Sequence, residues 1–205
     1  VQGEGGVIPL EVDYVQEIAR ICAKEDILLI IDEVQTGIGR TGTVFAFEQY
    51  GVMPDIVTSA KGLGGGLPLA AILFGQKTSS VFSYGDHATT FGANPGACAG
   101  ALEILQRLDR GFLEEVQEKG NKIKEKALGL PYVKSVTGKG LMLGMELEGI
   151  SSKELATKGI EQGVIILTAK DKARLLPPLN ITYEEIDEGF EALAQVFIPT
   201  SDKDL

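Results

Sequence analysis

The sequence predicts an α/β fold, with a mainly parallel sheet in the first half of the chain and a smaller α+β region in the second. Two observations support this prediction. Continuously apolar runs that suit strands covered on both faces, such as Ile27 to Ile31, alternate with helical patterns up to about Asp109. Beyond that point the strand patterns are short and group around glycines. We therefore expect two domains, residues 1–109 and residues 110–205.

The first domain is predicted to begin with a helix that Pro9 opens and that runs to about Lys24, with its apolar residues on one face. Three buried strands are then expected, at Ile27–Ile31, Asp55–Ala60 and Leu69–Phe74. A second long helix opens at Pro95. The first two strands, with a loop and a short helix between them, fit within about thirty residues, which is typical of a crossover between parallel strands.

The second domain is predicted to mix short strands with helices. The expected helices span residues 113–128, 153–162 and 183–197, and the expected strands span residues 133–137, 141–147, 164–167 and 174–176. Thr182 and Glu185 match the capping-box pattern, in which two side chains satisfy backbone N–H groups at the start of a helix. The last helix is therefore expected to begin at Tyr183.

The composition excludes several classes of protein. The net charge is −10 and no stripe of lysine or arginine offsets it, so we expect no nucleic-acid partner. No apolar run approaches the roughly 18 residues of a membrane span, and Val1 to Glu4 lack the features of a signal peptide. His87 is the only histidine and has no neighbours at ligand spacing, so we expect no metal site. These features indicate a cytoplasmic protein.

Two of the predicted strands end on residues that can carry chemistry. The first ends in Asp32-Glu33 and the second in Ala60-Lys61. In an open parallel sheet, ligands bind at the carboxyl ends of the strands, so an acid and an amine would face one crevice. Pyridoxal 5′-phosphate (PLP) needs this pair: the lysine forms a Schiff base, and the carboxylate keeps the pyridine nitrogen protonated. A surface salt bridge or an unrelated loop lysine is the alternative interpretation.

Two nucleotide motifs compete with this interpretation. Residues 37–42 match G-x-G-x-x-G, but five residues separate them from the preceding strand and the next strand ends in Lys61, which argues against a dinucleotide site. The strand before Asp32 also resembles the magnesium-holding strand of a P-loop ATPase, although no G-x-x-x-x-G-K-[ST] loop occurs in these residues. Thr89 to Gly92, ahead of the helix at Pro95, are either phosphate donors or a plain turn.

A long motif identifies the sequence as similar to a known family. The stretch Leu29 to Gly42, with Asp32-Glu33-Val34-Gln35-Thr36-Gly37 at its centre, closely resembles the signature of class-III aminotransferases. The likeness continues in register through Gly51–Ile56, Ala60–Gly66, Thr90–Pro95 and Arg174–Leu179, and it begins at Gln2–Gly6. It therefore spans nearly the whole chain, in the family's order.

The resemblance implies the PLP-dependent transferase fold of type I and gives each matching residue a role. Lys61 would form the Schiff base and would later carry the proton between the substrate and the cofactor. Asp32 would pair with the pyridinium nitrogen, and Gln35 would hydrogen-bond near the 3-oxygen of the ring. Thr90 would reach the phosphate of the neighbouring subunit, which implies a homodimer with a shared active site.

The resemblance also implies how substrates bind. Arg174 would hold the α-carboxylate, and Glu4 would pair with Arg174 until glutamate or 2-oxoglutarate displaces it. The substrates would be an amino acid and a 2-oxo acid, and the sequence looks most like members that move the ω-amine of N2-acetylornithine in arginine biosynthesis. Members acting on ornithine, succinyldiaminopimelate or 4-aminobutyrate, an aminomutase, and a non-catalytic remnant stay open as alternatives.

One part of the family's pattern is missing from these residues. The family's amino-terminal part supplies the turn that cradles the phosphate, an aromatic ring stacked on the cofactor, and a second substrate arginine. We therefore expect the 205 residues to be one part of a longer protein and to bind the cofactor poorly alone.

Overall fold

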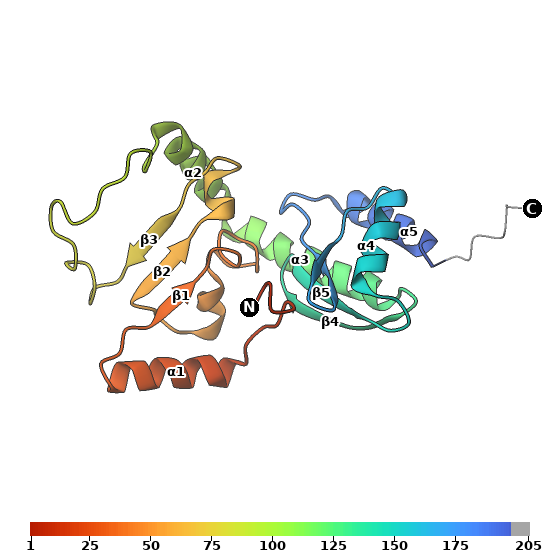
Figure 1. The fold of residues 1–205 in the computed structure, drawn as a ribbon, viewed down its shortest axis with the longest axis horizontal. Helices are drawn as coiled ribbons and strands as arrows, with labels where there is room; N and C mark the ends of the chain where they lie inside the picture. Colours follow the sequence, from red (N-terminus) through yellow and green to blue (C-terminus); the bar gives the residue numbers. More distant parts are fainter. Residues whose placement is uncertain (198–205) are drawn as a thin grey trace, which may run out of the picture. The chain divides into compact units, whose positions relative to one another are not determined.

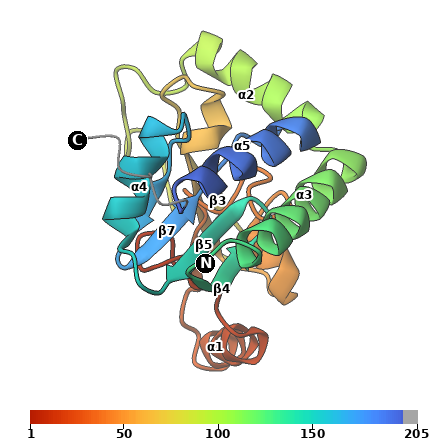
Figure 2. The same cartoon turned by 90° about the vertical axis from the view of Figure 1, so that its right-hand side faces the viewer.

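The structure, a computed structural model, describes residues 1–197 of the 205-residue chain. Two units are apparent, and both are drawn in Figures 1 and 2. Leu10–Glu115 form one of them, which we call the Lys61 unit. Val1–Pro9 join residues 116–197 to form the other, the Arg174 unit. The domain boundary near Asp109 stays a prediction.

The Lys61 unit contains two helices, three strands and two short 3-10 helices. They are α1 (Val12–Lys24), β1 (Ile30–Asp32), η1 (Ala46–Tyr50), β2 (Ile56–Ser59), η2 (Lys61–Gly64), β3 (Ala71–Phe74) and α2 (Pro95–Arg107). The start expected for α2 at Pro95 is confirmed. The Asn94 side chain caps it by accepting hydrogen bonds from the N–H groups of Gly96 at 3.0 Å and Ala97 at 3.2 Å.

The sheet of the Lys61 unit is mixed, so the prediction of a mainly parallel sheet was wrong. β1 and β2 are parallel, with Ile30 opposite Ile56 and Asp32 opposite Thr58, but β2 and β3 are antiparallel. Parallel strands need a crossover of about a dozen residues or more. The connection 33–55 provides one, whereas residues 60–70 contain only the short η2 and turn the chain back.

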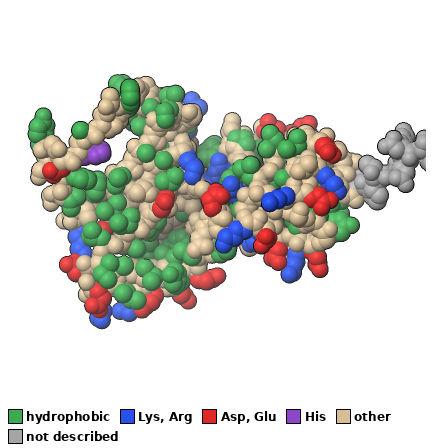
Figure 3. Space-filling view, viewed as in Figure 1, with side chains coloured by type: hydrophobic (Ala, Val, Ile, Leu, Met, Phe, Trp, Pro, Cys, Tyr) green, Lys and Arg blue, Asp and Glu red, His purple; other side chains and the backbone are tan. Residues whose placement is uncertain are grey.

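The core of this unit is small. Ile38, Leu63 and Ala101 form a buried cluster that joins the glycine-rich loop, η2 and α2. Apolar residues of the strands remain exposed: Ile30 and Ile72 are each 57% exposed. Hydrophobic side chains gather on the surface of this unit in Figure 3. Exposed apolar patches of this kind are surfaces that a further layer of structure normally covers.

The Arg174 unit is built on a four-stranded sheet in the order β4-β5-β7-β6, in which every pairing is antiparallel. Its elements are the greater part of α3 (Arg110–Leu128), then β4 (Val133–Lys139), β5 (Met142–Leu147), α4 (Ser152–Glu161), β6 (Leu167–Ala169), β7 (Lys172–Leu175) and α5 (Tyr183–Gln195). The capping box is confirmed, because Thr182 N–H donates to Glu185 Oε2 at 2.8 Å and Glu185 N–H donates to Thr182 Oγ1 at 3.1 Å.

The two faces of this sheet are covered differently. Helices α3, α4 and α5 cover one face, where Met145 and Ala173 belong to the main buried cluster (Figure 2). Val7, which is fully buried, packs on Met142 and Ala169 of the other face. The first nine residues therefore complete a layer of this unit, although more than a hundred residues separate them from it in the sequence.

Within residues 1–197, no helix combines the length and the apolar character of a membrane span. The same residues contain no group of three or more His, Cys, Asp or Glu side chains that could hold a metal ion.

Gly120 in α3 lets the helix approach the turn between β4 and β5. A Cβ on Gly120 would lie 2.3 Å from the carbonyl oxygen of Gly140, a backbone atom that cannot rotate away as a flexible side chain can. We expect Gly120→Ala to lower the free energy of unfolding by about 2–3 kcal/mol, measured by urea denaturation. Gly189→Ala in α5 is the matched control: nothing lies within 4 Å of its Cβ, so it should stabilise by roughly 0.5–1 kcal/mol. Equal effects of the two substitutions would contradict this account.

Candidate functional site

Asp32 and Lys61 lie at the carboxyl ends of two neighbouring parallel strands. Asp32 is the last residue of β1 and pairs with Thr58 of β2, and Lys61 follows β2 after Ser59 and Ala60. Both side chains belong to exposed residues. The acid and the amine predicted from the two strand ends therefore meet at one edge of the sheet, where open α/β sheets bind ligands.

The backbone at Lys61 is strained. Its φ angle is +47°, in the left-handed region that costs roughly 1–2 kcal/mol for a residue with a side chain. Leu63, two residues later, is buried against Ile38, so the η2 turn is anchored beneath the lysine. Ile38 is itself left-handed, with a φ of +56°. Strain of this kind concentrates at functional sites, where the surrounding structure imposes it.

Glu33 is a buried carboxylate beside the exposed Asp32. It is 1% exposed, and its side chain accepts hydrogen bonds from the N–H of Phe47 at 2.8 Å and from the hydroxyl of Thr36. Its backbone also accepts a bond from Gly37 N–H at 3.0 Å. These bonds fold the segment after β1 into a tight loop. Glu33 thus fixes the course of the chain on either side of Gln35.

Burial shifts the pKa of two groups near this loop. Burial raises the pKa of Tyr50. A backbone hydrogen bond opposes this rise, and the negative charge of Glu33 adds a smaller increase. Burial lowers the pKa of Arg40. The tyrosine therefore stays neutral at physiological pH.

The other two predicted cofactor residues, Gln35 and Thr90, lie in loops. Gln35 is half-buried in the loop directly after β1, three residues beyond Asp32. Thr90 is exposed in the loop that precedes α2, and it has no hydrogen bond or ion pair with Lys61 or Asp32 within residues 1–197. A short turn forms there, in which Gly92 N–H donates to Thr89 Oγ1 at 3.2 Å.

The Arg174 unit brings together the two predicted substrate residues. Arg174 Nη1 forms an ion pair with Glu4 Oε1 at 2.6 Å, across 170 positions of the sequence. The arginine residue is 9% exposed, whereas the glutamate side chain is 69% exposed. The arginine is therefore fixed in the sheet, and the glutamate is the partner that can move.

Within residues 1–197, one hydrogen-bond donor of Arg174 is unused. Its Nε is buried and has no hydrogen-bond partner among the described residues. Leaving a buried donor unpaired costs about 1–3 kcal/mol, and more for a charged group. The planar guanidinium can donate two parallel hydrogen bonds to the two oxygens of a carboxylate, and its Nε still has an N–H group to donate.

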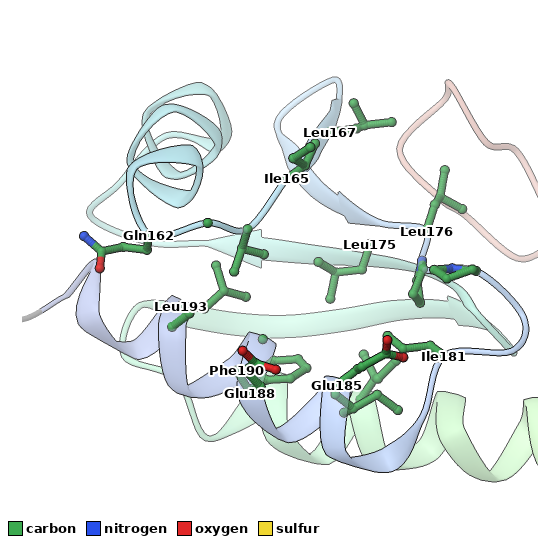
Figure 4. Close-up of a pocket in the computed structure, with 18 of the residues that line it drawn as sticks. Gln162, Ile165, Leu167, Leu175, Leu176, Ile181, Glu185, Glu188, Phe190 and Leu193 are labelled. Carbon is green, nitrogen blue, oxygen red and sulfur yellow. The ribbon is translucent and has the colours of Figure 1, made fainter.

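A separate cavity lies in the Arg174 unit between the sheet and α5 (Figure 4). Its volume is about 700 Å³, and aliphatic and aromatic side chains such as Leu176, Ile181 and Phe190 line it. Arg174 contributes to the lining, but Glu4 does not. Neither Lys61 nor Asp32 lines this cavity, so it is not the candidate site.

Comparison with known proteins identifies the family. The sequence profile described as "Aminotransferase class-III" matches residues 1–197. The chain belongs to the class-III aminotransferases. These enzymes are PLP-dependent, which agrees with the cofactor predicted from Lys61 and Asp32.

Individual class-III enzymes match over nearly all of the chain. The acetylornithine aminotransferase of Haemophilus ducreyi is 52% identical over 197 residues, which are 96% of this chain and 50% of that protein. The chain spans about half the length of the curated relatives it matches. Among solved structures, the N-acetylornithine aminotransferase of Stenotrophomonas maltophilia K279a has a TM-score of 0.85 and 35% identity, and the match covers 96% of this chain and 54% of that one. A PLP-bound amine transaminase from an uncultivated Pseudomonas species has a TM-score of 0.86 and 31% identity, with 96% and 50% covered.

The residues of the Lys61 unit fit the reactive part of PLP. Asp32 Oδ1 accepts a bond from Val34 N–H at 2.8 Å, while Oδ2 has no partner within the described part of the chain. That oxygen is available to a protonated ring nitrogen. Within the described residues, the amine of Lys61 forms no ion pair. A lysine must have its amine available in this way to bind an aldehyde.

The strand pattern alone gave Asp32 and Glu33 as one acidic pair, and the family resemblance gave a role only to Asp32. The structural role of Glu33 was missed. The signal was available in the strand pattern. Successive side chains of a strand point to opposite faces, so only one of two adjacent acids at a strand end can face the ligand. Glu33, the inward-facing one, is a buried hydrogen-bond acceptor instead.

Removal of the Glu33 side chain should loosen the loop that carries Gln35. We expect Glu33→Ala to cost roughly 2–4 kcal/mol of unfolding free energy, because Phe47 N–H and the Thr36 hydroxyl lose a buried acceptor. Glu48→Ala is the control. Glu48 is exposed and accepts one bond, from Phe45 N–H at 2.8 Å, so its loss should cost only roughly 0.5–1 kcal/mol. Urea unfolding of the two variants compares them, and equal costs would refute the structural function of Glu33.

Proposed function

We propose that this chain is part of a PLP-dependent aminotransferase that moves the ω-amine of N2-acetylornithine to 2-oxoglutarate. The observation that carries the proposal is the meeting of Lys61 and Asp32 at the ends of adjacent parallel strands. The identity of 52% with an acetylornithine aminotransferase supports the choice of substrate. Such a reaction belongs to arginine biosynthesis in the cytoplasm.

Each residue at the sheet edge has a chemical role in this proposal. Bound PLP would supply an electron sink for the substrate carbon that carries the amine. Lys61 would hold the cofactor covalently through its Nζ and, once substrate displaces it, would take and return a proton as a general base. Asp32 Oδ2 would keep the ring nitrogen protonated, and Gln35 would donate to an oxygen on the ring.

Arg174 and Glu4 would sort the two substrates. While the ω-amine reacts, Glu4 neutralises Arg174, so the site holds no uncompensated positive charge. When 2-oxoglutarate or glutamate binds, its α-carboxylate would replace Glu4, and the guanidinium of Arg174 would donate two parallel bonds to it. One arginine then serves both halves of the reaction.

The proposal needs more than these 205 residues. The chain spans about half the length of its relatives, and exposed apolar strand residues such as Ile30 and Ile72 support a further layer of the same fold. Residues 1–109 would be part of the PLP-binding domain, and residues 110–205 the small carboxy-terminal domain. Thr90 would reach the phosphate of a neighbouring subunit, which makes a homodimer part of the site.

Covalent trapping of the cofactor tests Lys61. The complete protein that contains these residues is mixed with PLP, reduced with borohydride, digested and mapped by mass spectrometry. We expect one label per chain, on Lys61, together with absorbance in the visible range before reduction. The variant Lys61→Ala should lose both signals.

The matched control is Lys77→Ala, which removes another lysine of the same unit, one that pairs with Asp26 at 2.5 Å. This variant should label normally. Labels scattered over surface lysines would overturn the proposed cofactor site. Turnover with acetylornithine, ornithine, succinyldiaminopimelate and 4-aminobutyrate then identifies the amine donor, and a donor other than acetylornithine would overturn the proposed substrate.

Arg174→Lys tests the proposed carboxylate site in the same protein. Lysine keeps the positive charge but cannot donate two parallel bonds from one rigid group. We expect KM for 2-oxoglutarate to rise roughly 10- to 100-fold, with a smaller change in KM for the amine donor, measured by steady-state kinetics. Arg110→Lys, at an arginine that is exposed and pairs with Glu114 at 2.7 Å, should change neither constant. A similar rise for both substrates would refute the sorting role.

A further inference from the structure

The movable partner of the ion pair, Glu4, is carried by a small hairpin. Gln2 and Ile8 form a β-bridge, in which Gln2 N–H donates to Ile8 O at 2.9 Å and Ile8 N–H donates to Gln2 O at 3.2 Å. At the turn, Val7 N–H donates to Gly3 O at 3.1 Å. Glu4 lies in this turn, so the position of its carboxylate depends on how the hairpin is attached to the sheet.

Val7 attaches the hairpin. It is fully buried on the sheet face that also carries Arg174, and its φ angle is +53°, a strained value for a β-branched residue. It lies directly over Gly144, where an added Cβ would come within 3.0 Å of the Val7 Cβ. Gly144 pairs with Arg174 in the sheet. Val7 therefore packs on β5 directly beside Arg174, which lies at the paired position of the neighbouring strand β7.

A directed chain of hydrogen bonds holds Val7 in this strained position. Lys172 Nζ donates to Thr137 Oγ1 at 2.8 Å, and Thr137 Oγ1 donates to Val7 O at 2.8 Å. An ammonium group can only donate, so it fixes the acceptor side of the hydroxyl. The hydroxyl hydrogen is then directed to Val7 O rather than to the more distant Gly144 O at 3.5 Å.

We infer that Thr137, oriented by Lys172, is a positioning residue that sets how strongly Glu4 competes for Arg174. The inference rests on the proposed function of the Glu4–Arg174 pair. Thr137 contacts neither residue of the pair. It acts through Val7, whose carbonyl ties the hairpin to the sheet and so determines how often the carboxylate of Glu4 lies within reach of the guanidinium.

The consequence is a balance between the two substrates. A firmly held hairpin keeps Glu4 on Arg174, which favours the amine donor and opposes a dicarboxylate. A loosened hairpin weakens that competition, so a dicarboxylate should bind more tightly. A single neutral hydrogen bond contributes roughly 1 kcal/mol, so its loss should change the competition about fivefold.

The first test needs no ligand and uses the complete protein that contains these residues. Thr137→Val removes the hydroxyl and keeps the shape, while Thr137→Ser keeps the hydroxyl. We expect amide hydrogen exchange at Gly6 and Val7 to become about fivefold faster in Thr137→Val and to stay near the native rate in Thr137→Ser. The Nε–H signal of Arg174 in ¹⁵N NMR should move toward its position in Glu4→Gln only in Thr137→Val. Unchanged exchange and an unchanged signal would overturn the inference.

The second test measures binding of glutarate to the complete protein that contains these residues, by titration calorimetry. Thr137→Val should tighten glutarate binding about fivefold, and Thr137→Ser should not. In a Glu4→Gln background, Thr137→Val should have no further effect, because the competing carboxylate is already gone. An equal effect with and without Glu4 would mean that Thr137 acts by general destabilisation, and would overturn the inference.

The two tests separate this inference from the proposed function. If glutarate binds no variant, including Glu4→Gln, then Arg174 is not a carboxylate site and the proposed function fails at that residue. The exchange rates and the Arg174 signal still decide, in that case, whether Thr137 positions Glu4. If glutarate binds as expected but the Thr137 variants behave alike, only the positioning inference fails.

Discussion

The parallel register between β1 and β2 is the constraint on which the Lys61 unit depends. It places Asp32 opposite Thr58, so the chain leaves both strands at the same edge with an acid on one and Lys61 on the other. Asp55 sets the register at the opposite end, because its carboxylate accepts a bond from Leu29 N–H at 2.8 Å while its own N–H donates to Leu29 O at 2.9 Å. A slip of one residue would turn Asp32 to the other face of the sheet.

The ion pair of the Arg174 unit depends on contacts between distant parts of the sequence. Arg174 is held by the strands on either side of it, where it pairs with Gly144 of β5 and with Leu167 of β6. Glu4 is carried by a hairpin and not by a strand of this sheet. The missing side chain at Gly144 leaves the space that Val7 fills. The same absence therefore lets the hairpin approach the sheet and brings the glutamate within reach of the arginine.

The sequence was sufficient for those features that depend on local pattern. The strand ends near Asp32 and Lys61 follow from the apolar runs that precede these residues, and the last helix follows from its capping box. The antiparallel β3 was missed because its apolar run has no directional signal, and only the short connection reveals it. No spacing could pair Glu4 with Arg174, since the sheet that joins them forms from segments far apart. That pair came from the resemblance to a family, as did Gln35 and Thr90, whose roles stay predictions.

A common arrangement supports the exposed residues of both units. Each of these proposed site residues lies next to, or within a few residues of, a buried residue that is fixed by the core. Asp32 adjoins the buried Glu33, Lys61 precedes the buried Leu63, and Glu4 precedes the buried Val7. Strained φ angles at Lys61 and Val7 persist because these anchors are stable enough to impose them. A reactive group must be accessible yet held in a narrow range of positions, and an exposed residue cannot supply its own restraint. The buried neighbour supplies it, which is why the packing of Glu33, Leu63 and Val7 contributes to the proposed site.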